Sequence, residues 1–272
     1  MCIEVITPHG FCGGVDRAIK MANAALDVAD APIFCLHEIV HNELVVRSLE
    51  RRGMRFVETL DDVPEGAVAI VSAHGAAPSV AAEAARRGIR LVDTTCPFVA
   101  AAHRKIRDNF AKGVRTAIIG EPSHAEVRGY LGEPGACLPE DVRPGEVADA
   151  VVQTTLDSGE HRGVCTATRD RQQAVLRFVE RHRESGSVGV LVVGSANSSN
   201  TRRLAEVAER AGAKAWRVST DEEAGRLDFG GVDVLGVTSG ASTPEDTLRS
   251  VLARLREPVA CDTILRVASA TK

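Results

Sequence analysis

The sequence of 272 residues lacks the features that mark several common protein classes. Its longest apolar run, VGVLVVG at 188–194, is too short to cross a membrane and suits a buried strand. The start, MCIEVITPHG, has neither the basic residues nor the apolar stretch of a secretory signal. The formal net charge is only −4, which gives no reason to expect a nucleic acid or an anionic membrane as partner. We therefore expect a globular cytoplasmic protein.

Paired cysteines and nucleotide motifs are missing as well. The seven cysteines are widely spaced and no two form a CxxC pair, which argues against both a zinc ribbon and a disulfide scaffold. There is no Walker A motif and no GxGxxG, so a nucleotide is not indicated. In the cytoplasm, such cysteines are metal ligands, catalytic groups or inert core residues.

The chain does contain a regular alternation of two kinds of segment. Short β-branched runs predict strands at 3–7, 32–36, 68–73, 89–93, 115–120, 189–194 and 232–238. Amphipathic runs predict helices at 14–28, 43–52, 78–87, 97–112, 169–184, 200–211 and 244–255. This alternation is typical of an α/β protein with mostly parallel sheets, and its loose period predicts three small α/β modules.

Polar residues of unusual type follow several of these strands. Cys12, His74 and Cys96 each come shortly after one, and His124 and Glu126 follow another. Parallel sheets bind ligands at the carboxyl ends of their strands, beside helix N-termini. Taken singly, a cysteine is most often a small buried hydrophobe and a histidine is most often structural. Because so many of these residues share one kind of position, the joint pattern indicates a site.

Three of the cysteines suggest a shared metal centre: Cys12, Cys96 and Cys165. Four thiolates would form a closed zinc site or an ordinary electron-transfer cluster. Three thiolates would leave one iron of a 4Fe–4S cluster open to bind a substrate and act as a Lewis acid.

The turns GSANSSN and TSGAST carry a group of hydroxyl and amide side chains, Ser198, Ser199, Asn200 and Ser242. Singly, a serine or asparagine at a helix start is most often a cap. Together with neutral histidines, such donors at helix N-termini suit an anion such as a phosphate or diphosphate.

These motifs match a known family. In family order, the matching stretches are PHGFCGGVDRAI, HEIVHN, SAHG, DTTCPFV, IGEPSHAEVRG, QTTL, VCTATRDRQQAV, VVGSANSSNTRRLAEVA and GVTSGASTPEDTL. Over nearly its whole length the chain resembles the 4-hydroxy-3-methylbut-2-enyl diphosphate reductases, iron–sulfur enzymes of the methylerythritol phosphate route to isoprenoids.

The resemblance implies a fold of three small α/β modules with mostly parallel sheets, in pseudo-threefold arrangement around a central cluster cavity. The modules are expected at 14–96, at 97–164 and at 165–262 plus 1–13, with a C-terminal tail at 263–272. The second module is shortened, because only residues 156–164 separate QTT from Cys165 where the family has a longer segment.

The resemblance also implies roles for individual residues. The expected ligands of a 4Fe–4S cluster are Cys12, Cys96 and Cys165. The expected substrate-binding residues are His41, His74, His124, Thr154, Thr155, Ser198, Ser199, Asn200 and Ser242. The expected catalytic residues are Glu126 as the proton-delivering carboxyl, Thr155 as a relay to the substrate hydroxyl, and His124.

The implied reaction is the reductive dehydroxylation of an allylic diphosphate to isopentenyl and dimethylallyl diphosphate. Electrons would come from a ferredoxin- or flavodoxin-like partner. Position 9 is His where the family usually has Arg or Lys, and this departure and the short segment leave open a divergent iron–sulfur reductase that acts on another allylic or phosphorylated substrate. A non-catalytic iron–sulfur sensor is a further alternative, although it would not need the carboxyl, hydroxyl and amide set.

One motif favours another class. HEIVH, at 37–41, has the HExxH pattern with which zinc proteases hold a metal through two histidines on one helix. Here the strand at 32–36 ends just before His37, and Asn42 is a good N-cap for a helix that begins after it. We therefore predict that His37 and His41 lie on a strand-to-helix turn, where residues four apart do not share a helix face.

Overall fold

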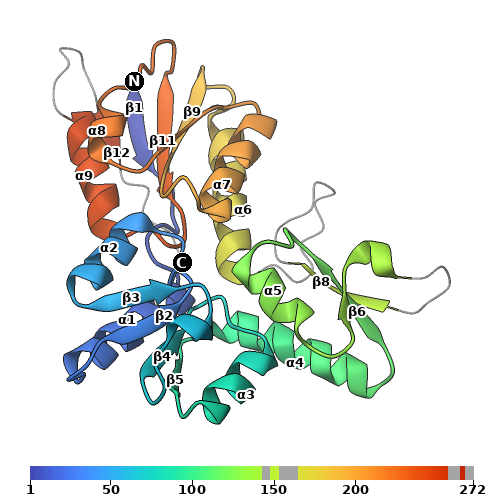
Figure 1. The fold of residues 1–272 in the computed structure, drawn as a ribbon. Coiled ribbons are helices and arrows are strands. Elements are labelled where there is room, and N and C mark those ends of the chain that lie inside the picture. The colour runs from blue at the N-terminus through green and yellow to red at the C-terminus, as the bar shows by residue number, and fades with distance from the viewer. Residues whose placement is uncertain (143–147, 153–164, 257–263, 267–272) are drawn as a thin grey trace. The chain divides into compact units, whose positions relative to one another are not determined.

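The computed structural model describes residues 1–142, 148–152, 165–256 and 264–266 (Figure 1). The chain forms two compact units, one of Met1–Cys12 with Thr166–Lys272 and the other of Gly13–Cys165. Their strands pair into three separate sheets, and every pairing is parallel among the described residues. The predicted α/β class is confirmed, whereas the module boundaries stay a prediction.

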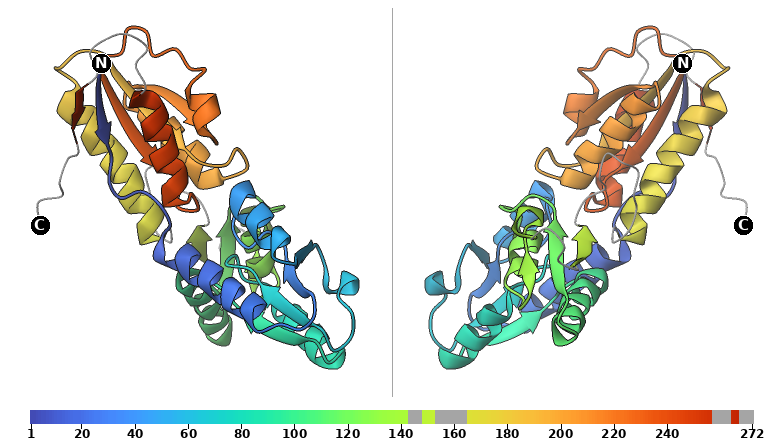
Figure 2. Two further views of the ribbon diagram at one scale, coloured as in Figure 1. Left: turned by 90° about the vertical axis from the view of Figure 1, so that its left-hand side faces the viewer. Right: turned by 90° about the vertical axis from the view of Figure 1, so that its right-hand side faces the viewer.

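The first unit holds a five-stranded sheet in the order β10-β9-β11-β1-β12. Its strands are β1 (Cys2–Val5), β9 (Val188–Val193), β10 (Lys214–Val218), β11 (Val234–Ser239) and β12 (Ile264–Arg266). Its helices are α6 (Thr166–His182), α7 (Ser199–Arg210), α8 (Asp221–Ala224) and α9 (Glu245–Arg256). The N-terminal strand is therefore built into a sheet made otherwise by the last third of the chain (Figure 1 and Figure 2).

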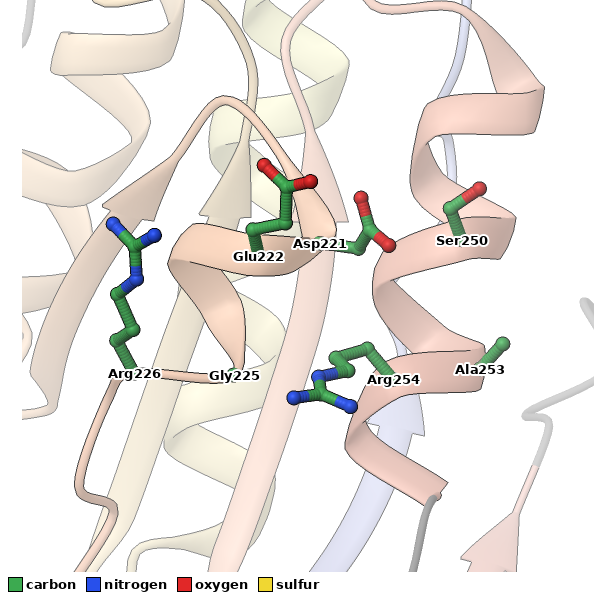
Figure 3. Close-up of a pocket in the computed structure, with 7 residues that line it drawn as sticks. All are labelled: Asp221, Glu222, Gly225, Arg226, Ser250, Ala253 and Arg254. Atoms are coloured by element: carbon green, nitrogen blue, oxygen red, sulfur yellow. The ribbon is translucent and has the colours of Figure 1, made fainter.

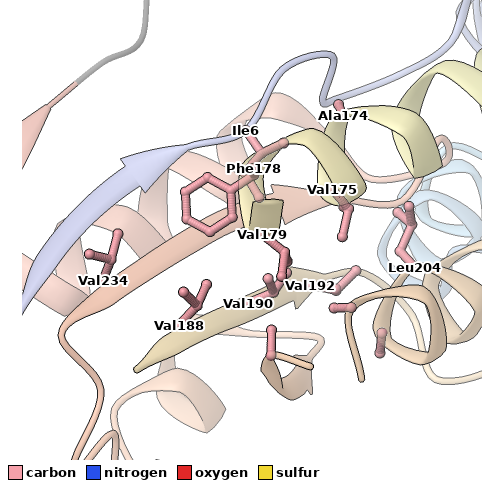
Figure 4. Close-up of a cluster of buried hydrophobic side chains, with 13 residues drawn as sticks. Ile6, Ala174, Val175, Phe178, Val179, Val188, Val190, Val192, Leu204 and Val234 are labelled. Carbon is pink, nitrogen blue, oxygen red and sulfur yellow. The ribbon is translucent and has the colours of Figure 1, made fainter. Parts of the chain in front are cut away.

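Alternation along β9 explains why helices cover this sheet on both faces. Val188, Val190 and Val192 belong to a buried cluster with α6 and α7, which includes Phe178 and Leu204 (Figure 4). The intervening side chains of the same strand belong to a second cluster with α8 and α9. A strand buried on both faces needs a continuous apolar run, which is what VGVLVV supplies.

The second unit holds two smaller sheets. The four-stranded sheet has the order β3-β2-β4-β5, from β2 (Ile33–Leu36), β3 (Met54–Val57), β4 (Val68–Val71) and β5 (Arg90–Asp93). The three-stranded sheet has the order β7-β6-β8, from β6 (Arg115–Ile119), β7 (Ala136–Cys137) and β8 (Ala148–Val152). The helices of this unit are α1 (Gly13–Asp27), α2 (Glu43–Arg51), α3 (Pro78–Arg86), α4 (Pro97–Ala111) and α5 (Ala125–Leu131), and short 3₁₀ turns lie at Leu60–Asp62 and Pro139–Asp141.

All seven predicted strands and all seven predicted helices are present, with ends that differ by a few residues. The elements missing from the prediction are mostly short, among them β3, β10, α5 and α8. Short helices give too few turns for a clear hydrophobic period, so α5 reads as a polar loop. Among the described residues, no helix combines the length and the apolar character that crossing a membrane requires.

Candidate functional site

Three histidines meet within the second unit. His41 lies between β2 and α2, His74 follows β4, and His124 precedes α5. The rings of His41 and His74 stack with centroids 4.3 Å apart, and His124 lies edge-on to both at 4.8 and 5.5 Å. All three are substrate-binding residues in our prediction, and the fold brings them together from positions 83 residues apart in the chain.

Hydrogen bonds define how the protons of two of these rings are placed. The Nδ1 atom of His124 accepts from the backbone N–H of Glu126, so His124 is both the N-cap of α5 and an acceptor. Burial, and next the charge of His41, lower the pKa of His124 to about 4, so that its ring is neutral at pH 7 with its proton on Nε2. This Nε2–H then donates to His41 Nε2 at 2.9 Å, and His41 donates through Nδ1 to Glu38 at 3.0 Å.

His74 is also neutral at pH 7. Burial lowers its pKa well below the ordinary value, and a positive charge on His41 or His124 acts in the same direction. Its Nδ1 lies 3.3 Å from the hydroxyl of Ser72. Neutral rings of this kind can donate hydrogen bonds to an anion without the desolvation cost of a buried imidazolium.

A half-buried carboxyl lies beside the histidines. Glu126 is in the first turn of α5, and burial raises its pKa to about 7. Two contacts oppose that rise, a hydrogen bond from the hydroxyl of Tyr130 to Glu126 Oε1 at 2.9 Å and the charge of His41. A carboxyl with a pKa close to neutral can hold a proton at working pH and give it up during a reaction.

The three predicted cluster ligands share one local position. Cys12, Cys96 and Cys165 directly precede the long helices α1, α4 and α6, where unpaired N–H groups and the helix dipole favour negative charge. A Cβ on Gly14 would come within 2.4 Å of Cys96 Sγ, so this sulfur packs against bare backbone. The charges of Cys96 and Cys165 both contribute to raising the pKa of Tyr130, although burial and Glu126 contribute more.

By their chemistry alone, cysteines at helix N-termini suit an iron–sulfur cluster. Thiolates are the usual ligands of such clusters, and helix N-termini stabilise anionic sulfur. Within the described residues, no group of three or more His, Cys, Asp or Glu side chains is arranged to hold one metal ion. No disulfide joins the six cysteines of that part of the chain.

The first unit presents Cys12 beside the hydroxyl and amide turns. The backbone N–H of Cys12 donates to Ala241, which directly precedes Ser242. Gly10 nearby donates to the hydroxyl of Ser239 and accepts from Arg171. The loop that carries Cys12 is therefore fixed to the end of β11 and to α6.

Asn200 has an unusual environment in this unit. Both amide atoms of its side chain, Oδ1 and Nδ2, are buried and have no hydrogen-bond partner among the described residues. Its neighbour Thr201 packs against the opposite turn, because a Cβ on Gly240 would meet Thr201 Oγ1 at 2.4 Å. A buried amide without a partner is costly and needs an explanation, and a bound polar ligand is one.

The other predicted diphosphate residues lie close to Asn200 in the chain or on the adjoining turn. Ser198 is the N-cap of α7 and its hydroxyl accepts from the N–H of Thr201. This hydroxyl therefore has the structural role of a helix cap. Ser199 is the first residue of α7, and Ser242 is buried in the turn between β11 and α9. Thr154 and Thr155 lie outside the described residues.

Two residues of this neighbourhood were not predicted. Glu38, the glutamate of the HExxH motif, contacts His41 directly. Tyr130 contacts Glu126 from four positions further along α5, the spacing that places side chains on one helix face. The i, i+4 spacing is a signal in the sequence, but it has meaning only once residues 125–131 are known to be helical.

The protease motif has the predicted geometry of a turn. His37 and His41 lie in an irregular segment, and the φ of His37 is +59°, outside the right-handed helical region. Asn42 is the N-cap of α2 and accepts from Leu44 and Val45. The two histidines therefore do not form the helical zinc pair, and the prediction of a strand-to-helix turn is confirmed.

A separate pocket of about 580 Å³ lies in the first unit between α8 and α9 (Figure 3). Its lining residues are Asp221, Glu222, Gly225, Arg226, Ser250, Ala253 and Arg254. It contains none of the predicted site residues, and its two acidic and two basic side chains give it no consistent charge.

Parallel sheets that present neutral histidines, a half-buried carboxyl and helix-terminal cysteines at their strand ends define an α/β enzyme. The family model described as LytB protein matches residues 3–162 and 140–256. The chain belongs to the LytB family.

Named relatives and solved structures agree with this family. The 4-hydroxy-3-methylbut-2-enyl diphosphate reductase of Pseudomonas aeruginosa strain LESB58 is 40% identical, over 94% of this chain and 91% of its own. A protein of Burkholderia mallei with the name 4-hydroxy-3-methylbut-2-enyl diphosphate reductase 2 is 42% identical, over 94% and 86%. The structure of the E-1-hydroxy-2-methyl-but-2-enyl-4-diphosphate reductase from Plasmodium falciparum aligns with a TM-score of 0.86 at 28% identity, over 98% of this chain and 91% of that one.

Proposed function

We propose that the protein is an oxidoreductase that reduces 4-hydroxy-3-methylbut-2-enyl diphosphate to isopentenyl and dimethylallyl diphosphate. The reaction consumes two electrons and two protons. The allylic C–O bond breaks, a C–H bond forms, and the hydroxyl oxygen leaves as water. A ferredoxin- or flavodoxin-like protein is the proposed source of the electrons.

The observation that carries this proposal is the meeting of Glu126 with three histidines. A hydroxyl is a poor leaving group, so its departure needs a proton at the right place. Glu126, with its pKa near 7, can supply one. Neutral His74 and His124 lie beside it, and the Nε2–H of His124 can donate to a substrate group that takes the place of His41 as its acceptor.

The proposed diphosphate site is on the first unit. Asn200 has an amide to offer, and the first N–H groups of α7 add donors of the kind that bind phosphate at helix N-termini. Ser199 and Ser242 are the proposed hydroxyl ligands. Fixing the diphosphate holds the rest of the substrate in place, which lowers the entropic cost of reaction. Thr155 stays the proposed relay to the substrate hydroxyl.

Cys12, Cys96 and Cys165 are the proposed ligands of a 4Fe–4S cluster. When bound, such a cluster supplies electrons and a Lewis-acidic iron that three protein ligands leave open. The cysteines contribute thiolates at helix N-termini, and Gly14 leaves room for the sulfur of Cys96.

The test is an anaerobic assay of the purified protein with 4-hydroxy-3-methylbut-2-enyl diphosphate and a chemical reductant, with identification of the products. We expect both isomeric diphosphates. A protein with an intact cluster that leaves this substrate unchanged would contradict the proposal, and would point to a reductase of a different allylic or phosphorylated substrate.

The cluster has its own test. Changing Cys12, Cys96 or Cys165 to Ser is expected to remove the brown colour and the bound iron, whereas Cys35→Ser serves as the matched control. Cys35 is fully buried in β2 and burial raises its pKa to about 12, as expected for an inert core thiol. A colourless wild-type protein with stoichiometric zinc would contradict the cluster.

A further inference from the structure

Tyr130 is a buried residue that has no role in the proposed reaction as described above. It is only 2% exposed, and its ring belongs to an apolar cluster with Val99, Ile106 and Val127. The ring of His103 packs against it with centroids 4.9 Å apart. Its hydroxyl reaches out of this cluster to Glu126 Oε1 at 2.9 Å.

A second buried group holds Tyr130 in place. His103 donates through Nδ1 to Glu133 at 2.8 Å, and both side chains are less than a tenth exposed. The backbone N–H of Glu133 in turn donates to the carbonyl of Tyr130. The ring therefore cannot turn away from Glu126 without disrupting a packed and hydrogen-bonded layer.

The direction of the hydrogen bond follows from the partners available. A buried tyrosine O–H needs an acceptor, and among the described residues Glu126 is the one hydrogen-bonded to it. If the hydroxyl instead accepted a proton from Glu126, its own hydrogen would have no other hydrogen-bond partner among the described residues. The phenol keeps its proton at any working pH, so Tyr130 is a permanent donor to Oε1.

We infer that Tyr130 is a positioning residue that selects the proton-delivering oxygen of Glu126: because Oε1 accepts from Tyr130, the acidic proton is on Oε2. A protonated carboxyl has one O–H and one carbonyl oxygen, and the Tyr130 hydroxyl fixes which is which. Since an acid must be within hydrogen-bond reach of the group that it protonates, choosing the oxygen also chooses the direction of proton delivery. The inference that this proton serves the substrate rests on the proposed function.

The direct test is a spectroscopic one that needs no turnover. In the anaerobically purified full-length protein at pH 6, the infrared difference between wild type and Glu126→Gln isolates the carbonyl stretch of protonated Glu126. Tyr130→Phe keeps the ring and removes the donor, so we expect this band to move to higher frequency. An unchanged band, or a shift to lower frequency, would overturn the inference whatever the activity.

Kinetics test the same inference from another side. Tyr130→Phe is expected to lower kcat about tenfold, which is less than the roughly 10²- to 10⁴-fold that a positioned acid contributes, and to leave KM within about twofold. In a Glu126→Gln background, the same change is expected to have less than about a twofold effect, since no acidic proton remains to be positioned. An equal loss in both backgrounds would overturn the inference, because Tyr130 would then act independently of Glu126.

The matched control is Thr116→Val, which removes another buried hydroxyl without changing the shape of the side chain. Thr116 is fully buried in β6 and its Oγ1 accepts from Asn109. It should leave both the infrared band and kcat unchanged, and a loss equal to that of Tyr130→Phe would overturn the inference by showing a general effect of hydroxyl removal. A wild type that does not convert the substrate would defeat the proposed function alone, because the infrared band still reports on Tyr130.

Discussion

Two helix starts carry asparagines with buried amide groups, and the two amides differ in what they contact. Asn42, before α2, is 3% exposed and accepts from the N–H groups of Leu44 and Val45. Asn200, in the first turn of α7, has no partner for either amide atom among the described residues. The first amide stabilises its own helix, whereas the second is positioned for something that the protein itself does not supply.

The two units that carry these asparagines, the first with Asn200 and the second with Asn42, differ in the chemistry of their predicted site residues. The proposed diphosphate residues of the first unit are hydroxyls and an amide, which do not titrate near pH 7. The second unit contributes His74, His124 and Glu126, whose pKa values all depart from their ordinary values because of burial. We therefore expect binding of the diphosphate to depend on the first unit and proton transfer to depend on the second.

Of the substitutions that test the difference between Asn42 and Asn200, Asn200→Ala should have the largest effect on KM. Hydrogen bonds to charged groups contribute about 1.5–3 kcal/mol, so KM for the diphosphate substrate should rise about 10- to 150-fold. The free energy of unfolding without ligand should stay the same or increase, because a buried unpaired amide is removed. Steady-state kinetics and urea unfolding measure the two quantities.

The control for this change is Asn197→Ala, which removes an exposed amide from the same turn. It should leave KM within about twofold, since exposed polar groups contribute little. An equal rise in KM for Asn197→Ala and Asn200→Ala would show that Asn200 has no special role in binding the diphosphate.

The pH dependence of kcat should report on Glu126. Since burial raises its pKa to about 7, the protonated form is lost above that pH and kcat should fall about tenfold per pH unit. Glu126→Gln should show no such decline. A decline of the same size in both proteins would assign it to another group.

Stability should change with pH in two opposite ways in the acid range. The raised pKa of Glu126 stabilises the fold fully below about 4.5, its ordinary value, and this contribution is lost as pH rises through about 7. The lowered pKa of His124 contributes stability above about 6.5 that is lost as pH falls through about 4. Unfolding of His124→Gln over this range should lack the second change.

The smallest effect should be that of Asn42→Ala. Loss of a side chain that caps two N–H groups should lower the free energy of unfolding by about 1 kcal/mol, with KM changed less than about threefold. A large rise in KM with unaltered stability would mean that Asn42, like Asn200, serves a ligand.

The strands and long helices could be predicted because apolar runs and 3.6-residue periods are local properties of the sequence. The turn at 37–42 was also predictable, since Asn42 marks the start of the helix. The two histidines of the HExxH motif come before it and so cannot form a helical zinc pair. The missing hydrogen-bond partner of the Asn200 amide could not be predicted, because it depends on the positions of all neighbouring residues. The bond from Tyr130 to Glu126 was missed because it depends on α5, which is too short for a clear period.

The kcat of Glu126→Gln, measured with the cluster retained, tests the central claim most directly. The substitution preserves the shape of the side chain and removes the acidic proton. We expect kcat for 4-hydroxy-3-methylbut-2-enyl diphosphate to fall about 10²- to 10⁴-fold while KM stays within about threefold. A kcat equal to that of the wild type would show that Glu126 delivers no proton and would contradict the mechanism.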